Sequence, residues 1–165
     1  MSPKPKPAQK KATAAQKSLK ISAKARYALR ILADIALHAE DATPRTIAAI
    51  ACEQQISEKF VSRIVIPLRK AGMIVSLRGI AGGFRLTRAP EDITLLEIVE
   101  IQQGPLEILD CLGEKAACGR KERCAVRSIW EDVNTAFRDA LARITLATVL
   151  KRIRSTPTTS ADYCI

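Results

Sequence analysis

Hydrophobic positions in the first third of the chain repeat with the 3.6-residue period of α-helices. Ser22 can cap a helix start, and small or apolar side chains recur behind it every three or four positions; these are Ala25, Ala28, Leu29, Leu32, Ile35 and Ala36. We expect a second, shorter helix to open at Thr43-Pro44, because a proline in the first helical turn loses no hydrogen bond. A third helix is expected between Ser57 and Gly72, whose residue types favour the two ends of a helix.

The second and third helices are separated by Gln54-Gln55-Ile56, and the third has a polar and basic outer face. Two helices joined by such a short turn are typical of the helix-turn-helix motif, although an ordinary helical hairpin has the same pattern. Pro67 conflicts with a regular third helix, because an interior proline removes a hydrogen bond and clashes with the preceding turn. We therefore expect the third helix to kink or break at Pro67.

A β-hairpin is predicted directly after the third helix, because residues 73–86 contain two strand-favouring runs around a glycine-rich turn. Arg78 would lie at the hairpin tip, where it could enter a minor groove. Gly79, Gly82 and Gly83 can adopt positive φ angles and let the backbone approach a phosphodiester. Three helices followed by such a wing predict binding to double-stranded DNA.

Thr94 and Glu97 match a capping box, which predicts a short helix with Ile98 and Ile101 on its inner face. After the cysteine-containing segment comes one long helical pattern. Its hydrophobic residues continue at helical spacing through about seven turns; they are Val126, Ile129, Trp130, Val133, Phe137, Leu141, Ile144 and Thr148. A single helix of roughly 26 residues would be about 40 Å long, longer than the winged domain that it leaves. Its free apolar side predicts pairing with the same helix of a second copy, so we expect a homodimer. A monomeric bundle is the alternative.

Charge is concentrated at the start of the chain. The formal net charge is +10, and residues 1–20 contribute six lysines and no acid. We expect these residues to form a disordered tail that either improves solubility or adds phosphate contacts. Residues 21–80 hold nine basic and five acidic side chains, which leaves a net charge of +4 on the predicted DNA-binding part. No apolar run is long enough for a membrane helix, so we expect a cytoplasmic protein without a membrane partner.

Three of the five cysteines, Cys111, Cys118 and Cys124, lie in one segment with little regular pattern. Thiolates are soft ligands that select zinc, Cu(I) or iron–sulfur clusters, and the basic side chains nearby favour the thiolate form. Unligated structural or redox thiols are the alternative. Cys52 is expected to be a small core residue, and the single histidine, His38, a packed or capping residue.

The chain resembles the Rrf-type winged-helix regulators, the family of iron–sulfur sensors such as IscR, NsrR and RirA. The resemblance covers about residues 19–150 and rests on the opening segment 19–28, the wing segment 78–84, the three cysteines and Ile129-Trp130. It implies that Cys111, Cys118 and Cys124 hold a 2Fe–2S or 4Fe–4S iron–sulfur cluster. Arg127 stands where IscR-like members carry a histidine, and Arg26 where NsrR-like members carry an acid. The resemblance therefore favours a cluster with three protein thiolates and an exchangeable fourth position.

The resemblance also implies DNA contacts from the third helix and the wing. The expected set is Ser57, Lys59, Phe60, Ser62, Arg63, Arg78, Gly79, Gly82 and Gly83. Ser62 stands where IscR-like members can carry a glutamate, so the operator need not match theirs. We expect a mainly α fold with a small β-hairpin wing, organised as a winged helix-turn-helix and a long C-terminal dimerisation helix. The expected division is a basic tail (1–20), a DNA-binding domain (21–92), a cluster-binding loop and dimerisation helix (93–154) and a flexible tail (155–165).

These features predict a homodimeric transcription regulator, expected to be a repressor, that binds an inverted-repeat operator and senses iron, nitric oxide or redox state through the cluster. A thiol- or zinc-based regulator on the same scaffold is one alternative. An iron–sulfur electron carrier or assembly factor is another, although it has no need for a DNA-binding wing. An enzyme is not expected, because the sequence shows no nucleophile–base set and one histidine.

Overall fold

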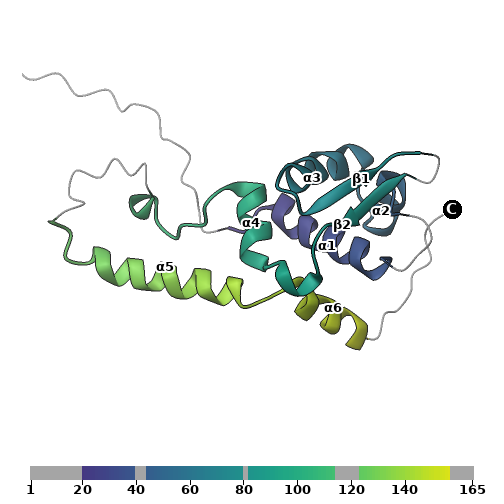
Figure 1. Cartoon of the computed structure of the whole chain (residues 1–165). Coiled ribbons are helices and arrows are strands. Elements are labelled where there is room, and N and C mark those ends of the chain that lie inside the picture. The colour runs from purple at the N-terminus through teal and green to yellow at the C-terminus, as the bar shows by residue number, and fades with distance from the viewer. Residues whose placement is uncertain (1–19, 40–43, 80–81, 114–122, 157–165) are drawn as a thin grey trace, which may run out of the picture.

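The computed structural model describes residues 20–39, 44–79, 82–113 and 123–156 (Figure 1). The described residues are mainly helical with one two-stranded hairpin, so the expected fold class is confirmed. In chain order the elements are α1 (Ala23–Leu37), α2 (Ile47–Glu53), α3 (Glu58–Lys70), β1 (Ile74–Leu77), β2 (Gly83–Leu86), the 3-10 turn η1 (Pro90–Asp92), α4 (Leu95–Gln103), the 3-10 turn η2 (Asp110–Leu112), α5 (Arg127–Ala142) and α6 (Leu146–Ser155).

The expected helix ends are confirmed where a local residue type determines them. Ser22, Ser57 and Thr94 each accept a hydrogen bond from the backbone N–H three residues later, at 3.1, 3.3 and 3.2 Å. Gly72 follows α3 with a φ of +71°, a conformation that glycine adopts without strain. Its N–H and the following N–H bond back to carbonyls of the last turn, which satisfies the open end of α3.

The second helix starts later than expected. Its N-cap is Thr46, and the expected opening at Thr43-Pro44 is wrong for the described residues, because Pro44 and Arg45 precede the helix. The reason is a tertiary contact that the local pattern does not contain. The Phe84 N–H of β2 donates to the Arg45 carbonyl at 2.8 Å, so this segment forms a short antiparallel bridge with the hairpin.

A break at Pro67 is also wrong, because α3 continues as a helix through Pro67 to Lys70. A proline disturbs the carbonyls in the turn before it. Here the side-chain amide of Gln102, on α4, donates to the Ile64 carbonyl at 3.0 Å. This contact ties the turn before Pro67 to α4, and the buried Leu68 anchors the same stretch in the core.

The core surrounds α1, which packs against α3, α4, α6 and β2. The hairpin is antiparallel and pairs Ile74 with Leu86 and Leu77 with Gly83. The largest fully buried side chains come from most of these elements, so α2, α3 and the hairpin share one core with α1, α4 and α6. These side chains are Ile31, Leu32, Ile35, Ile50, Val61, Ile64, Leu68, Met73, Ile74, Ile93, Ile98 and Leu146.

The spacing predicted a single C-terminal helix of roughly 26 residues. This prediction is wrong, because the pattern is divided between α5 and α6. The chain leaves the helical path at Ile144 and Thr145. Thr145 pairs with Thr94 in an isolated bridge and also caps α6 through the Thr148 N–H at 3.3 Å. Leu146 follows and is fully buried, so α6 turns back and packs against α1.

Helix α5 extends away from the winged part of the molecule (Figure 1). Its second half packs on α4 through Phe137 and Leu141, and Arg138 forms an ion pair with Glu100. In the described part of the chain, no helix is both long and apolar enough to cross a membrane.

Candidate functional site

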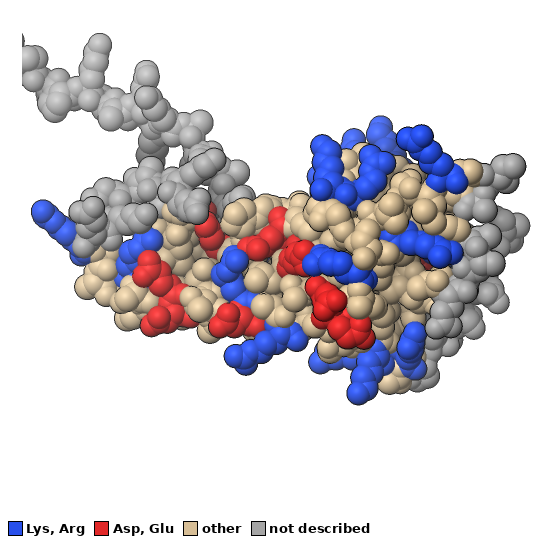
Figure 2. Space-filling view, in the orientation of Figure 1, with Lys and Arg blue, Asp and Glu red and all other residues tan. Residues whose placement is uncertain are grey.

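Basic side chains gather on the outer face of α3, and Figure 2 shows them along the top of the winged part. Lys59, Arg63, Arg69 and Lys70 are all exposed there. Ser62 is half-buried, and its hydroxyl donates to the Glu58 carbonyl at 2.9 Å. Lys59 and Arg63, two of the expected residues of the third helix, therefore lie on one exposed basic surface.

Phe60 lies at the edge of this surface and is half-buried. Its ring meets Tyr27 of α1 edge to face, with centroids 5.5 Å apart. The Arg30 guanidinium lies 5.1 Å from the Tyr27 ring centroid, and its Nε donates to the Gln54 side chain at 2.8 Å. Tyr27 and Arg30 thus hold the helix-turn-helix turn from α1. The sequence reasoning missed this cluster, although the three-residue spacing placed both residues on one face of α1.

The glycines of the wing are explained partly by its own packing. Gly79 has a φ of +119°, and Arg78 beside it is exposed. A Cβ on Gly82 would lie 2.7 Å from the Leu77 carbonyl oxygen. A Cβ on Gly83 would lie 2.7 Å from the carbonyl oxygens of residues 44 and 45. Gly82 and Gly83 are therefore required for the hairpin turn and for its contact with the segment before α2.

A buried charge cluster lies behind the wing. Asp34 of α1 is 3% exposed, and its Oδ1 lies 3.0 Å from Arg45 Nη2 and 3.1 Å from His38 Nδ1. Burial raises the pKa of Asp34, and the positive charge of Arg45 opposes this rise. His38 is the C-cap residue of α1, which confirms its expected capping role.

The cysteine segment begins at η2, which contacts α5, and ends at the start of α5. Cys111, in η2, is half-buried, and Cys124 is exposed. The Arg127 side chain donates to the Cys111 carbonyl, while its backbone N–H donates to the Cys124 carbonyl at 3.1 Å. Arg127 also pairs with Glu131 at 2.7 Å. One arginine therefore contacts the chain on both sides of residues 114–122.

Cys118 lies outside the described residues. Among the residues that the structure describes, no three His, Cys, Asp or Glu side chains lie close enough together to hold a metal ion. Cys52 is half-buried in α2, away from the cysteine segment in the sequence.

The first half of α5 carries an exposed apolar stripe. We call Val126, Ile129, Trp130 and Val133 the α5 stripe; each is between 43% and 59% exposed, and their spacing places them on one face. In the second half of α5 the apolar side chains are covered instead, because Phe137 packs on α4.

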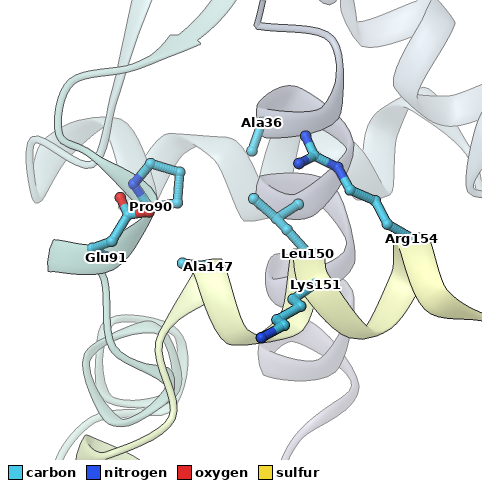
Figure 3. Close-up of a pocket in the computed structure, with 7 residues that line it drawn as sticks. All are labelled: Ala36, Pro90, Glu91, Ala147, Leu150, Lys151 and Arg154. Atoms are coloured by element: carbon cyan, nitrogen blue, oxygen red, sulfur yellow. The ribbon is translucent and has the colours of Figure 1, made fainter.

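A hollow of about 520 Å³ lies between the end of α1, η1 and α6 (Figure 3). Leu150 points into it toward Ala36, and Lys151 and Arg154 extend to different sides. The hollow contains none of the expected DNA-binding or cysteine residues.

Comparison with known proteins agrees with this architecture. The model of the Rrf2 family, described as "Iron-dependent Transcriptional regulator", matches residues 21–152. The transcriptional regulator IscR of Vibrio campbellii is 32% identical over 133 residues, which cover 81% of this chain and 78% of that protein. Protein rrf2 of Nitratidesulfovibrio vulgaris is 35% identical over 136 residues, covering 81% of this chain and 88% of that protein.

Among solved structures, CymR of B. subtilis, titled a global cysteine regulator, superposes with a TM-score of 0.67 at 30% identity. The match covers 81% of this chain and 97% of that one. The family match extends across nearly all described residues. Together with the winged fold and the basic α3 surface, it identifies the protein as a DNA-binding regulator and not an enzyme. The chain therefore belongs to the Rrf2 family of transcriptional regulators.

Proposed function

We propose that this regulator is a homodimeric repressor whose operator affinity depends on an iron–sulfur cluster held by Cys111, Cys118 and Cys124. The observation that carries the proposal is the position of Arg127, which contacts the backbone of both Cys111 and Cys124 at the start of α5. Because both ends of the cysteine segment contact the start of α5, a change in that segment would alter the position of α5.

The DNA-contacting residues in this proposal are on α3 and the wing. The α3 face would enter the major groove, as the second helix of a helix-turn-helix does, and the wing would reach the neighbouring minor groove with Arg78. The exposed cations on α3 support this arrangement. The proposed contacts are Ser57, Lys59, Phe60, Ser62, Arg63, Arg78, Gly79, Gly82 and Gly83.

The donor chemistry of the cysteine segment fits a thiolate-bound cluster. Cys111 and Cys124 carry free thiols, and Arg127 contacts the backbone of both residues. Arg123 and Arg127 add positive charge that offsets the negative charge of a thiolate-ligated cluster. When bound, such a cluster supplies a redox-active and oxygen- or nitric-oxide-reactive centre. The protein's own part is to orient the thiols and to connect the loop to α5.

A second copy of the chain is the proposed partner of the α5 stripe. Large apolar side chains on one exposed helix face favour burial against a matching surface. Two-fold pairing of α5 helices would place two winged domains on the half-sites of an inverted repeat, which is how helix-turn-helix dimers read DNA.

A series of contacts connects the cysteine segment to the recognition helix. Asn134 of α5 accepts from the Ile108 N–H at 3.0 Å, which holds the segment before Cys111 against α5. Arg138 of α5 pairs with Glu100 of α4. Gln102, on the same helix α4, bonds to a carbonyl of α3. Release of the cysteine loop would therefore change how α5 supports α4, and so bias the placement of the two recognition helices.

A thiol-based regulator on the same scaffold is the second candidate. It is favoured by the free thiols of Cys111 and Cys124 and by the similarity to CymR, a cysteine regulator. The two candidates differ in bound iron and acid-labile sulfide, which a thiol sensor lacks.

The test is the Cys118→Ala variant purified without oxygen. We expect it to lose visible absorption, iron and acid-labile sulfide while its helix content, measured by circular dichroism, stays unchanged. Cys164→Ala is the matched control, because it removes a cysteine outside the cysteine segment and should leave the absorption intact. A Cys118→Ala protein that keeps its full iron and sulfide would overturn the proposed ligand set.

A further inference from the structure

The position of the wing depends on the backbone of Arg45. The Phe84 N–H of β2 donates to the Arg45 carbonyl at 2.8 Å, and Gly83 packs directly on the carbonyl oxygens of residues 44 and 45. The next residue, Thr46, caps α2. A displacement of Arg45 would therefore move the hairpin relative to the helix-turn-helix.

The side chain of Arg45 is fixed by Asp34 of α1. Its Nη2 lies 3.0 Å from one carboxylate oxygen and 3.3 Å from the other. The carboxylate is 2% exposed and the arginine side chain 17%, so water competes little for this ion pair. Within the described residues, Asp34 is the one buried charged residue. Its helix α1 also packs against α3, so one helix supports both the recognition helix and the wing.

The energetics of such a pair favour a role in geometry over a role in stability. Removing two charges from water costs several kcal/mol per ion, roughly what their attraction returns, and apolar replacements are often equally stable. The raised pKa of Asp34 agrees, because the cost of burial exceeds the help that Arg45 gives to the charged form. What an apolar pair would lack is a directional contact that holds the Arg45 backbone against β2.

We propose that the Asp34–Arg45 ion pair is a positioning device that sets the wing relative to the recognition helix and thereby determines operator affinity. The inference rests on the proposed function, in which Arg78 of the wing contacts DNA. Asp34 and Arg45 are positioning residues here: they act on DNA through the wing.

The test uses a variant that removes the pair without leaving a buried charge, Asp34→Leu combined with Arg45→Met. The net charge is unchanged, so the general attraction to phosphates is kept. The matched control is Arg88→Met with Glu97→Gln, which removes an exposed ion pair at the other end of β2 with the same change in charge. Operator affinity is measured at one salt concentration for each variant, alone and combined with Arg78→Ala.

Arg78→Ala and the pair variant are each expected to weaken operator binding about tenfold, and the combined variant also about tenfold, because both changes remove one wing contact. The control pair should stay within about twofold. Arg45→Lys should retain most of the affinity, since a single nitrogen makes the contact. A combined loss of about a hundredfold, meaning independent effects, would overturn the inference while leaving the wing contact in place. An unchanged affinity of Arg78→Ala would overturn the wing contact itself, and the inference with it.

Amide hydrogen exchange separates this role from a general loss of stability. In the pair variant, the Phe84 amide should exchange faster while the amide of Leu68 in α3 keeps its protection. Equal protection of Phe84 in both proteins would contradict the inference, and a uniform loss across α3 and the hairpin would indicate a purely structural role.

Discussion

A carboxylate in the core of a helical domain needs partners for its burial, and Asp34 has a cation, Arg45, and a histidine, His38, beside it. Arg45 and His38 both lie within 3.1 Å of its Oδ1. Desolvation nevertheless raises the pKa of Asp34. The site therefore costs stability when it is charged, and the free energy of unfolding should depend on pH in a definite direction.

The folded chain binds the Asp34 proton more tightly than the unfolded chain does. The contribution of this site to the free energy of unfolding therefore falls as pH rises from about 3.9, the unfolded value, through the raised pKa. Asp34→Asn removes this dependence. We predict that the stability of wild type relative to Asp34→Asn decreases as pH rises through that window, measured by urea unfolding.

The charged and titratable groups that face Asp34 are Arg45, His38 and Glu53. A relative stability that instead increases with pH would show a lowered pKa and contradict the burial argument.

At this scale, sequence predicted the features that depend on neighbouring residues. The caps at Ser22, Ser57 and Thr94 are local and were correctly placed. An acid at Asp34, inside an apolar run, could have signalled a buried charge. Its partner Arg45 could not be predicted, because the pairing of the segment before α2 with β2, a tertiary contact, holds Arg45 in place.

Among the elements, the division between α5 and α6 determines which apolar side chains of the C-terminal helical pattern stay exposed and could contact a partner. Hydrophobic spacing alone continues through Ile144 and Thr145, so it predicted one helix. The break comes from the bridge between Thr94 and Thr145, a contact across the fold that periodicity cannot contain. Pro67 is the converse case, because a hydrogen bond from Gln102 of α4 supports a turn that local rules disfavour.

With α6 packed on α1, the α5 stripe remains as the exposed apolar face of the first half of α5. We predict that Trp130→Glu weakens dimerisation by at least about a hundredfold, because it would place a charge at the centre of the proposed dimer interface. Sedimentation velocity across a concentration series measures the effect. Thr135→Glu is the control, since Thr135 lies on the opposite face of α5 and is exposed. A Trp130→Glu protein that stays dimeric would place the dimer interface elsewhere.

In the whole molecule, α5 lies between the cysteine segment and the winged part, and α4 lies between α5 and the recognition helix (Figure 1). The contacts of Arg127, Arg138 and Gln102 occur in that order along this path. A change at the cysteine segment can therefore reach the recognition helix through the packing of α5 on α4 and of α4 on α3.

The fold and the DNA-binding role could be predicted from the sequence because the helix pattern, the turn and the wing are each local and occur together. The sensed signal could not, because cysteines such as Cys111 and Cys124 serve both thiol and cluster chemistry. The similar proteins agree with this, since they include IscR and the global cysteine regulator CymR.

Operator affinity of the cluster-loaded dimer, compared with that of the cluster-free dimer at one salt concentration, tests the central claim most directly. Because Arg127 joins the cysteine segment to α5, we predict that the loaded protein binds an inverted-repeat operator at least about tenfold more tightly. Cys118→Ala should show the weaker affinity under both conditions. Equal affinities for the loaded and cluster-free proteins would contradict the claim that the cysteine segment controls DNA binding.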